Sequence, residues 1–507
     1  TKNYTSQDKS ENDFAYHFAL NMLNSCDENA ILFVSGDNET FPLWYLQQCE
    51  NVRADVSVVN LSFLNNDWYI DKIQNAGKAS FKIPLSVSKE NYKAGKAEIL
   101  PVINNTAAFY DFIYMLKHDE IQSEFLKIHD EFCSLLRKSR YDIRNKTEFE
   151  SFEEYFKNIR PLGSNKDFLN YCSLVVNLED DEVSRAYGIS KDEATNLIKM
   201  LQEYLILEKG YTTNPDICLD FMFVDDTAFM VKTGFYDYPV NYCPVRDFVW
   251  PINKQEVMKS FAKIGLREDL IIDNMKWSLD TARKSLNKSD LMVLEIIRSN
   301  KWERPVYFSS VMSSENYLGL DKYLYLEGLA FRLIPVETEV SANDPVNINS
   351  ATMYENFINR FKWGTLEYND ENIRNMLIVL RTHYSKLARG LYLAGATKQS
   401  EQVLNNCIKI IPNDLVPFEY SSVGLVHGYY RLGKVKEAGV VSLIIADNAS
   451  KEIEFYAGFP PNMTKNFEPY KLRAQKTIQE LIYLAQQYKN QDLAAELNKI
   501  YGKVVNR

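Results

Sequence analysis

The stretch AILFVSGDNETFPLWYLQQ, residues 30–48, decides the fold, because its pattern changes from strand to helix across a short polar turn. Residues 30–34 form an apolar run that ends at a Ser-Gly pair, which is typical of a strand buried on both faces of a parallel sheet. Residues 36–40 turn the chain, and residues 41–48 predict a helix.

A second strand and a second helix follow at residues 56–61 and 68–75. Two strand–helix units in succession predict parallel strands joined by a right-handed crossover. In the first helix, Pro42 is acceptable only within the first turn, where no backbone donor is needed. The residues expected to cap the free amides of that turn are Asp37, Asn38 and Thr40.

The same sheet is expected to continue later in the chain. Apolar runs at residues 305–309 and 330–335 predict two further strands, and residues 317–329 between them predict a crossover helix. An amphipathic helix at residues 11–29 precedes the first strand. We therefore predict a Rossmann-like α/β domain with a mostly parallel sheet over residues 1–340.

A less regular stretch, residues 84–250, interrupts this domain and is expected to be a helical and hairpin insertion. Its topology does not follow from the sequence pattern. The elements predicted here and just beyond are helices at residues 106–140, 148–156, 191–207 and 254–300, and strands at 219–224 and 228–232 joined by a turn at Asp225-Asp226.

After a polar linker at residues 341–350, strand patterns nearly vanish, and residues 341–507 predict an all-helical domain. Its helices come in pairs with glycine in the turns, an arrangement that resembles tetratricopeptide hairpins. A plain helical bundle is the alternative. The predicted pairs are residues 371–393 with 396–411, 419–432 with 434–448, and 469–488 with 490–503.

Composition excludes several functional classes. The 507 residues carry a formal net charge of −10, which disfavours nucleic-acid binding. The seven cysteines and five histidines form no Cys-x-x-Cys or His-Glu-x-x-His motif, so no metal and no cofactor are expected. No apolar run is long enough to span a bilayer, and the first residue is Thr1 rather than Met, which favours a processed protein or a piece of a longer one.

Polar and aromatic residues follow the first two predicted strands at the edge where parallel sheets bind ligands. Carboxylates and amides there would bond sugar hydroxyls or a cation, and an aromatic ring would stack on a sugar. The candidate ligand-binding residues are Asp37, Asn38, Glu39, Thr40, Asn65, Asn66, Asp67, Trp68 and Tyr69.

Two other interpretations of these residues remain open. The first is structural, because Asp, Asn and Thr at strand ends are ordinary helix caps. The second is an α/β hydrolase or transferase that uses Asp37, Glu39 and Asp67 for acid–base chemistry. No phosphate-binding glycine loop and no Gly-x-Ser-x-Gly motif is present.

Several motifs resemble a family of bacterial membrane proteins similar to protein O-mannosyltransferases. The motifs are GDNETFPLWY at residues 36–45, VNLS at 59–62 and DWYI at 67–70, with Glu39 where the family usually has Asp. The later segments WERPVYFSS (302–310) and NYLGLDKYLYLEGLAFRLIPV (316–336) also resemble family signatures.

The resemblance implies that this chain is the soluble extracytoplasmic region that follows the membrane-spanning part, on the periplasmic face of the bacterial inner membrane. The transferase residues of the family would lie in the membrane part, so no catalytic residue is assigned here. The expected partners are the protein's own transmembrane region, a glycan or acceptor at the α/β domain, and a protein at the helical tail. A purely structural spacer is a further alternative.

Overall fold

The structure is a computed structural model. It describes residues 13–76, 82–103, 210–234, 237–261, 266–337, 347–364 and 371–505, and the short pieces 108–109, 111–113, 115–117, 181, 184, 190–192 and 194–195. The helices predicted at residues 106–140, 148–156 and 191–207 lie largely or wholly outside the described residues.

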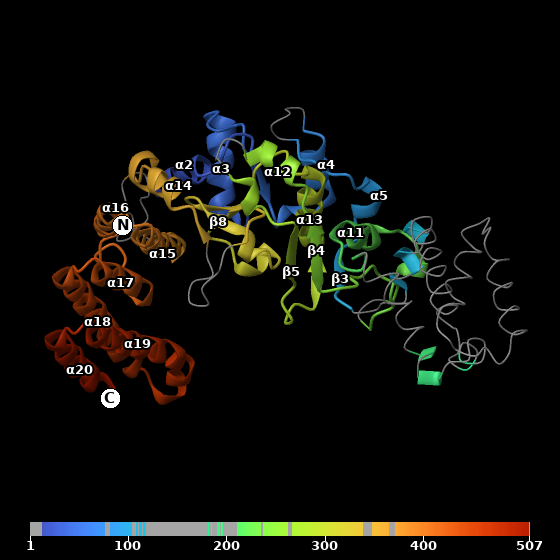
Figure 1. Cartoon of the computed structure of the whole chain (residues 1–507). Coiled ribbons are helices and arrows are strands. Elements are labelled where there is room, and N and C mark those ends of the chain that lie inside the picture. The colour runs from blue at the N-terminus through green and yellow to red at the C-terminus, as the bar shows by residue number, and fades with distance from the viewer. Residues whose placement is uncertain are drawn as a thin grey trace, which may run out of the picture.

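A six-stranded sheet forms the centre of the α/β part, with the strand order β10-β8-β9-β7-β1-β2 (Figure 1). The central strand β1 (Ile31–Val34) pairs in parallel with β2 (Ser57–Asn60) and with β7 (Val306–Ser309). All residues of these three strands are buried, as expected for the interior of a parallel sheet. The predicted strands in these three regions are therefore confirmed.

The sheet as a whole is mixed, because β10, β8, β7, β1 and β2 run in one direction and β9 runs in the other. β9 (Ala330–Leu333) runs antiparallel to β7 and to β8 (Leu324–Leu326). The crossover helix predicted at residues 317–329 is wrong, since this segment contains short 3-10 turns and β8, which forms a hairpin with β9. Gly319 and Gly328 have positive φ values of 82° and 152°, which interrupt any helix.

Helices surround the sheet. The chain between β1 and β2 forms α3 (Asp37–Cys49), which packs against α2 (Phe14–Asn24) and β2. The chain between β2 and β7 includes α4 (Asp67–Gln74) and α13 (Lys288–Asn300). α13 begins with a capping box, in which the side chains of Asn287 and Asp290 each accept a hydrogen bond from the backbone amide of the other residue.

In the segment between α4 and α13, the two predicted strands at residues 219–224 and 228–232 are not present. Residues 219–224, predicted as a strand, belong almost entirely to helix α11 (Pro215–Phe223). Asn214 caps this helix and Pro215 takes its first position, a strong helix start. The predicted strand at 228–232 is also wrong: Asp226 caps a 3-10 turn, and only an isolated bridge from Val231 to Val240 follows.

Two small antiparallel sheets also occupy this part of the chain. β4 (Asp247–Pro251) pairs with β5 (Asn274–Ser278), and β3 (Ile99–Pro101) pairs with β6 (Ser285–Asn287). The single helical stretch predicted at 254–300 therefore contains α12 (Lys254–Phe261), the strands β5 and β6, and α13.

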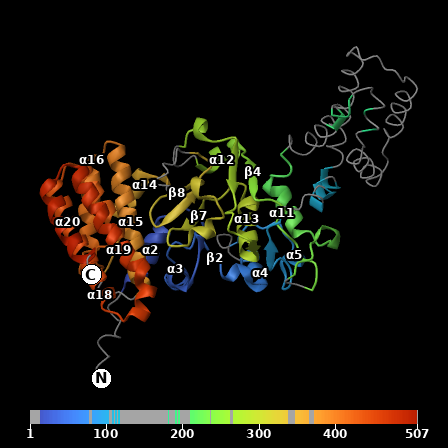
Figure 2. The same cartoon turned by 90° about the horizontal axis from the view of Figure 1, so that it is seen from below.

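The C-terminal part is helical, as predicted, although residues of the expected linker supply the edge strand β10 (Asn347–Ile348). Its helices pack against their neighbours in sequence and lie at one end of the molecule (Figure 2). Gly395 and Gly433, both with positive φ, stand in two of the turns. The helices are α14 (Ser350–Tyr354), the π-helix η8 (Glu355–Arg360), α15 (Glu371–Leu393), α16 (Thr397–Ile410), α17 (Val423–Arg431), α18 (Val435–Ala457), α19 (Pro461–Gln487) and α20 (Gln491–Val505).

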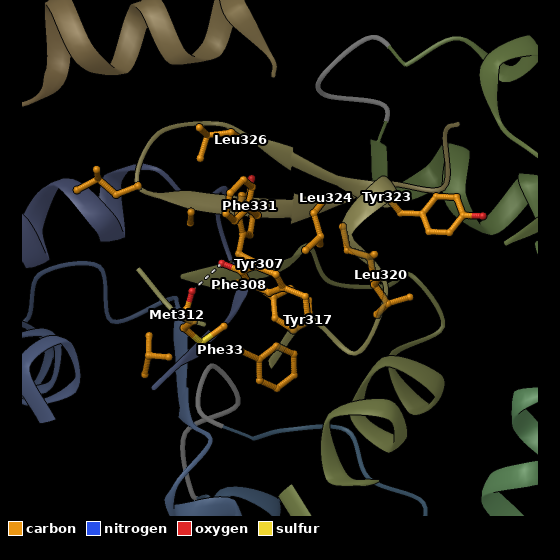
Figure 3. Packing of buried hydrophobic residues seen from close by; sticks show 14 of the residues in the cluster. Phe33, Tyr307, Phe308, Met312, Tyr317, Leu320, Tyr323, Leu324, Leu326 and Phe331 are labelled. Carbon is orange, nitrogen blue, oxygen red and sulfur yellow. Dashed lines mark hydrogen bonds between the residues drawn. The ribbon is translucent and has the colours of Figure 1, made fainter. Parts of the chain in front are cut away.

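Aromatic side chains fill the core between the central strands (Figure 3). The rings of Phe33 and Phe308 lie 5.0 Å apart across the β1–β7 pair, and Tyr317 contacts Phe308 edge-on at 5.9 Å. The Tyr317 hydroxyl donates to the carbonyl of Ser309. A buried tyrosine therefore anchors the loop after β7 to the end of that strand.

The α/β part and the helical tail are joined by direct contacts. The side-chain amide of Asn21 on α2 donates to the carbonyl of Lys362, and its oxygen accepts from the Lys362 amide. Nearby, Asn349 donates to the buried carboxylate of Glu327, which also accepts from Tyr307 and lies 3.5 Å from buried Arg332. Polar groups thus hold the two parts against each other.

Candidate functional site

The carboxyl ends of β1, β2 and β7 lie at one edge of the sheet. Val34 is in register with Asn60, and Phe33 with Phe308. Three features therefore meet at this edge: the first turn of α3, the loop before α4, and Ser309 at the end of β7. This is the position where open parallel sheets bind ligands.

Glu39 is the most strongly perturbed acid at this edge. It is only 3% exposed, and its carboxylate accepts from the amide of Ser35 and from the hydroxyl of Ser309, each at 2.5 Å. Burial raises the pKa of Glu39 to about 7, although both hydrogen bonds act to lower it. Glu39 therefore changes its charge near neutral pH.

Thr40 and Tyr69 support the site from inside. The Thr40 hydroxyl donates to the carbonyl of Gly36 and accepts from the side-chain amide of Asn60 at 2.7 Å. The backbone amide of Asn60 donates to the hydroxyl of Tyr69 at 3.0 Å. Both side chains are buried, so they fix the end of β2 rather than face solvent.

Asp37 and Asn38 are exposed and occupy the first turn of α3. The helix starts earlier than predicted, with Gly36 (φ 92°) as the N-cap and no side-chain cap. The expected capping by Asp37, Asn38 or Thr40 is therefore wrong. Pro42 lies beyond the first turn, inside the helix, so its position was also wrongly predicted.

The residues after β2 have several different roles. Asn65 accepts from the amide of Ser289 at the start of α13, and Asn66 is exposed. Asp67 accepts from the amides of Trp68 and Ala94. Glu39 and Asp67 therefore make two separate sets of hydrogen bonds and do not form a hydrogen-bonded acid pair.

An exposed group of aromatic rings lies next to these residues, and we call it the aromatic surface. Trp68 is 54% exposed and Phe41 is 50% exposed. Beneath them, the half-buried rings of Trp44 and Phe63 stack with centroids 5.9 Å apart, and Phe63 contacts Trp68 at 6.0 Å. The aromatic surface consists of Phe41, Trp44, Tyr45, Phe63 and Trp68.

Of the aromatic surface, only Trp68 belongs to the predicted site, because Phe41, Trp44 and Tyr45 were assigned to an ordinary helix. Their spacing at i, i+3 and i+4 places three rings on one helical side, which is a usable signal. Phe63 was missed because its 3-10 turn, Phe63–Asn65, gives no periodic pattern.

A cavity of about 740 Å³ lies beside the aromatic surface, along the outer edge of β2. Trp44 and Tyr69 belong to its lining, together with Val58 and Val59 of the strand. Its walls are mainly apolar, so it suits the apolar face of a ligand better than a charged group.

Neither a metal cluster nor a membrane helix is found in the described part of the chain. No three His, Cys, Asp or Glu residues there are close enough to hold a metal ion. No described helix combines the length and the apolar character needed to cross a membrane.

Comparison with known proteins connects this chain to one family. The family model described as "TMEM260-associated domain 2" matches residues 15–222 and 209–352. The mouse protein O-mannosyl-transferase TMEM260 is 37% identical over 71 residues, which is 14% of this chain and 10% of the mouse protein. The protein O-mannosyl-transferase tmem260 of Dictyostelium discoideum is 33% identical over 67 residues, 13% of this chain and 8% of its own length.

The aligned regions thus span a tenth or less of these two relatives. No solved structure matches the chain significantly.

Proposed function

Because the chain belongs to the TMEM260-associated domain 2 family, we propose that it is a non-catalytic binding region of an O-mannosyltransferase-related membrane protein. In this proposal it lies on the extracytoplasmic side, which would be the periplasmic side in a bacterium. Its own membrane part is one partner, and the aromatic surface binds a glycan carried by the acceptor.

The observation that carries this proposal is the exposure of Trp68 and Phe41 at the carboxyl edge of the sheet. A folded protein gains stability by burying such rings, so two half-exposed rings on a rigid aromatic base favour a binding role. Trp44 and Phe63 stack beneath them and fix their orientation.

Sugar is the ligand that fits the chemistry of this edge. The flat apolar face of a sugar ring packs on an indole, and its hydroxyls need hydrogen-bonding groups around the ring. Asp37, Asn38 and Asn66 are exposed at the same edge and supply carboxylate and amide groups. The nearby cavity along β2 would receive an apolar part of the acceptor.

Acid–base catalysis by Asp37, Glu39 and Asp67 has less support from the geometry. Glu39 is buried and bonded to Ser309, while Asp67 accepts from two backbone amides elsewhere. An acid pair that acts on one bond needs two carboxylates facing a common space.

The test is titration of the chain with a mannosylated threonine peptide, followed by tryptophan fluorescence. The unglycosylated peptide is the ligand control. We expect the wild type to bind only the glycopeptide, and Trp68→Ala to weaken binding about fivefold, since loss of one ring contact is worth about 1 kcal/mol.

Tyr483→Ala is the matched variant, because Tyr483 is also an exposed aromatic residue but lies on α19 in the tail. Unchanged binding in Trp68→Ala, or equal binding of both peptides by the wild type, would contradict the proposal.

For the helical tail we propose a protein partner. Packed helical hairpins present concave faces, as repeat proteins do, and the tetratricopeptide-like class remains part of this proposal. Large exposed side chains such as Phe455 and Leu393 are candidates for the contact. A pull-down with the whole chain should lose its partner when Phe455 is changed to Ser, and an unaffected yield would count against this assignment.

A further inference from the structure

A second cavity, of about 1160 Å³, lies near the amino end of β7, on the side of the sheet away from the carboxyl ends of the parallel strands. Its wall is formed by residues 82–86, by Trp250, Pro251 and Asn253 at and after the end of β4, and by residues 297–304 at the end of α13, among others. It shares Asn75 and Ile83 with the cavity along β2 but none of the aromatic surface.

Two tryptophans line this cavity from different elements. Trp250 comes from β4, where its ring contacts Trp277, and Trp302 comes from the loop after α13, where its ring contacts Phe261. Both side chains are only partly buried. The cavity therefore offers two indole rings supported by aromatic neighbours.

The backbone that carries Trp302 is strained. Lys301 and Trp302 are successive non-glycine residues with φ values of 43° and 62°. The side chain of Asn300 clamps this loop, because it donates to the carbonyl of Arg304 and accepts from the Arg304 amide. Left-handed backbone in two such residues costs free energy and is concentrated at binding and catalytic sites.

Asp216 supplies an acceptor in the wall of the cavity. Its Oδ1 atom is buried and has no hydrogen-bond partner within the described part of the chain. Burial raises the pKa of Asp216, while the guanidinium of Arg298 acts in the opposite direction. That guanidinium is already engaged by Glu295 and Asp220. A buried acceptor without a donor needs an explanation, and a bound donor would provide one.

The basic groups of the cavity do not favour an anionic ligand. Arg304 donates to three backbone carbonyls and to the hydroxyl of Ser57, so it is fully used by the protein. The remaining charged side chains of the wall are balanced in sign, since they are Lys82, Lys301, Glu256 and Glu303.

We propose that this cavity binds a neutral oligosaccharide, which stacks on Trp250 and Trp302 and donates a hydroxyl to Asp216. A small rotation of the carboxylate about its last torsion, which is a soft one, turns Oδ1 toward the ligand. The volume exceeds that of a typical drug-sized site, so it accommodates more than one sugar ring. The site does not depend on the aromatic surface.

The test uses the whole chain and a set of neutral gluco-, galacto- and manno-configured trisaccharides, titrated by calorimetry. We expect at least one trisaccharide to bind the wild type. Asp216→Ala and Trp302→Ala should each weaken that binding at least tenfold, and Asp216→Asn, which keeps an acceptor oxygen, should recover part of it. Thermal unfolding of each variant verifies that it is folded.

Trp68→Ala is the matched control, because it removes a ring from the aromatic surface and leaves this cavity unchanged. If no trisaccharide binds the wild type, the inference is overturned. If Trp68→Ala alone abolishes binding while folded Asp216→Ala and Trp302→Ala bind normally, the inference is also overturned, but the proposed role of the aromatic surface stands.

Discussion

Replacing Glu39 by glutamine removes a buried carboxyl group whose protonation is coupled to folding. Burial raises the pKa of Glu39 to about 7, from 4.5 for an exposed glutamate. The folded protein therefore binds this proton more tightly than the unfolded chain does. Stability from this group is fully present below pH 4.5 and is lost as pH rises through 7.

The size of the effect follows from the two pKa values. The full difference corresponds to about 3 kcal/mol, and about 2 kcal/mol of it is lost between pH ~5.5 and pH ~8.0. Glutamine has nearly the same shape, so its oxygen keeps the bond from Ser35 and its amide bonds the hydroxyl of Ser309. Glu39→Gln should remove this part of the pH dependence.

Urea unfolding, followed by the fluorescence of tryptophans such as Trp44 on α3, measures the effect at both pH values. The difference in unfolding free energy between Glu39→Gln and the wild type should be about 2 kcal/mol more favourable to the variant at pH ~8.0 than at pH ~5.5. Ser309→Ala is the informative companion, because losing a bond to the charged form should shift the pH-dependent loss to higher pH. Equal pH slopes in wild type and Glu39→Gln would refute this reasoning.

Three further changes test the fold. Gly319→Ala should destabilise the α/β part by at least about 2 kcal/mol, since the new Cβ would lie 2.3 Å from the carbonyl oxygen of Ser278 at a φ of 82°; an unfolding midpoint in urea equal to that of the wild type would contradict this. Glu327→Ala leaves buried Arg332 without one of its acids and should cost about 3 kcal/mol in urea unfolding; a cost below about 1 kcal/mol would exclude a strong ion pair. Asn287→Ala removes the capping box of α13 and should cost about 1 kcal/mol in the same assay, whereas no loss would mean that the cap is dispensable.

The central strands were predictable because each is a short apolar run with polar or glycine boundaries. A strand buried on both faces needs no alternation of polar and apolar residues, so residues 30–34, 56–61 and 305–309 stand out directly. The parallel pairing of the first two strands also follows from the strand–helix order, whereas residues 305–309 were predicted only to join the same sheet, and their pairing with β1 was not predicted.

The hairpin of β8 and β9 was not predictable in the same way. Residues 317–329 contain apolar residues at spacings that fit either a helix or a strand, and a short segment does not decide between them. Gly319 and Gly328 decide against a helix here, because both have positive φ values that a helix does not allow. Residues 219–224 show the reverse error, because the helix start at Asn214-Pro215 outweighs an apolar run that looks like a strand.

The candidate site was predictable in place but not in detail. The sequence places Glu39 and Asp67 at one sheet edge. In the structure, however, Glu39 accepts a hydrogen bond from Ser309 and Asp67 accepts one from Ala94, so the two carboxylates belong to separate hydrogen-bond networks. Trp68 and Tyr69 are adjacent in sequence, yet opposite sides of α4 leave one exposed and bury the other. Such differences depend on where each helix begins, because its first residue determines which side chains face the core. The predicted start of α3, residue 41, is four residues later than its actual start at Asp37.

The pairing of β1 with β7 has a consequence for biosynthesis. β1 and β2 leave the ribosome early, but the second neighbour of β1 is synthesised only after the whole stretch up to Val306. At about 5–20 residues per second, the open edge of β1 waits on the order of ten seconds or longer for its partner. Such long-range closure makes folding slow and exposes an apolar strand edge to aggregation, so chaperone dependence during synthesis is the expected cost of this topology.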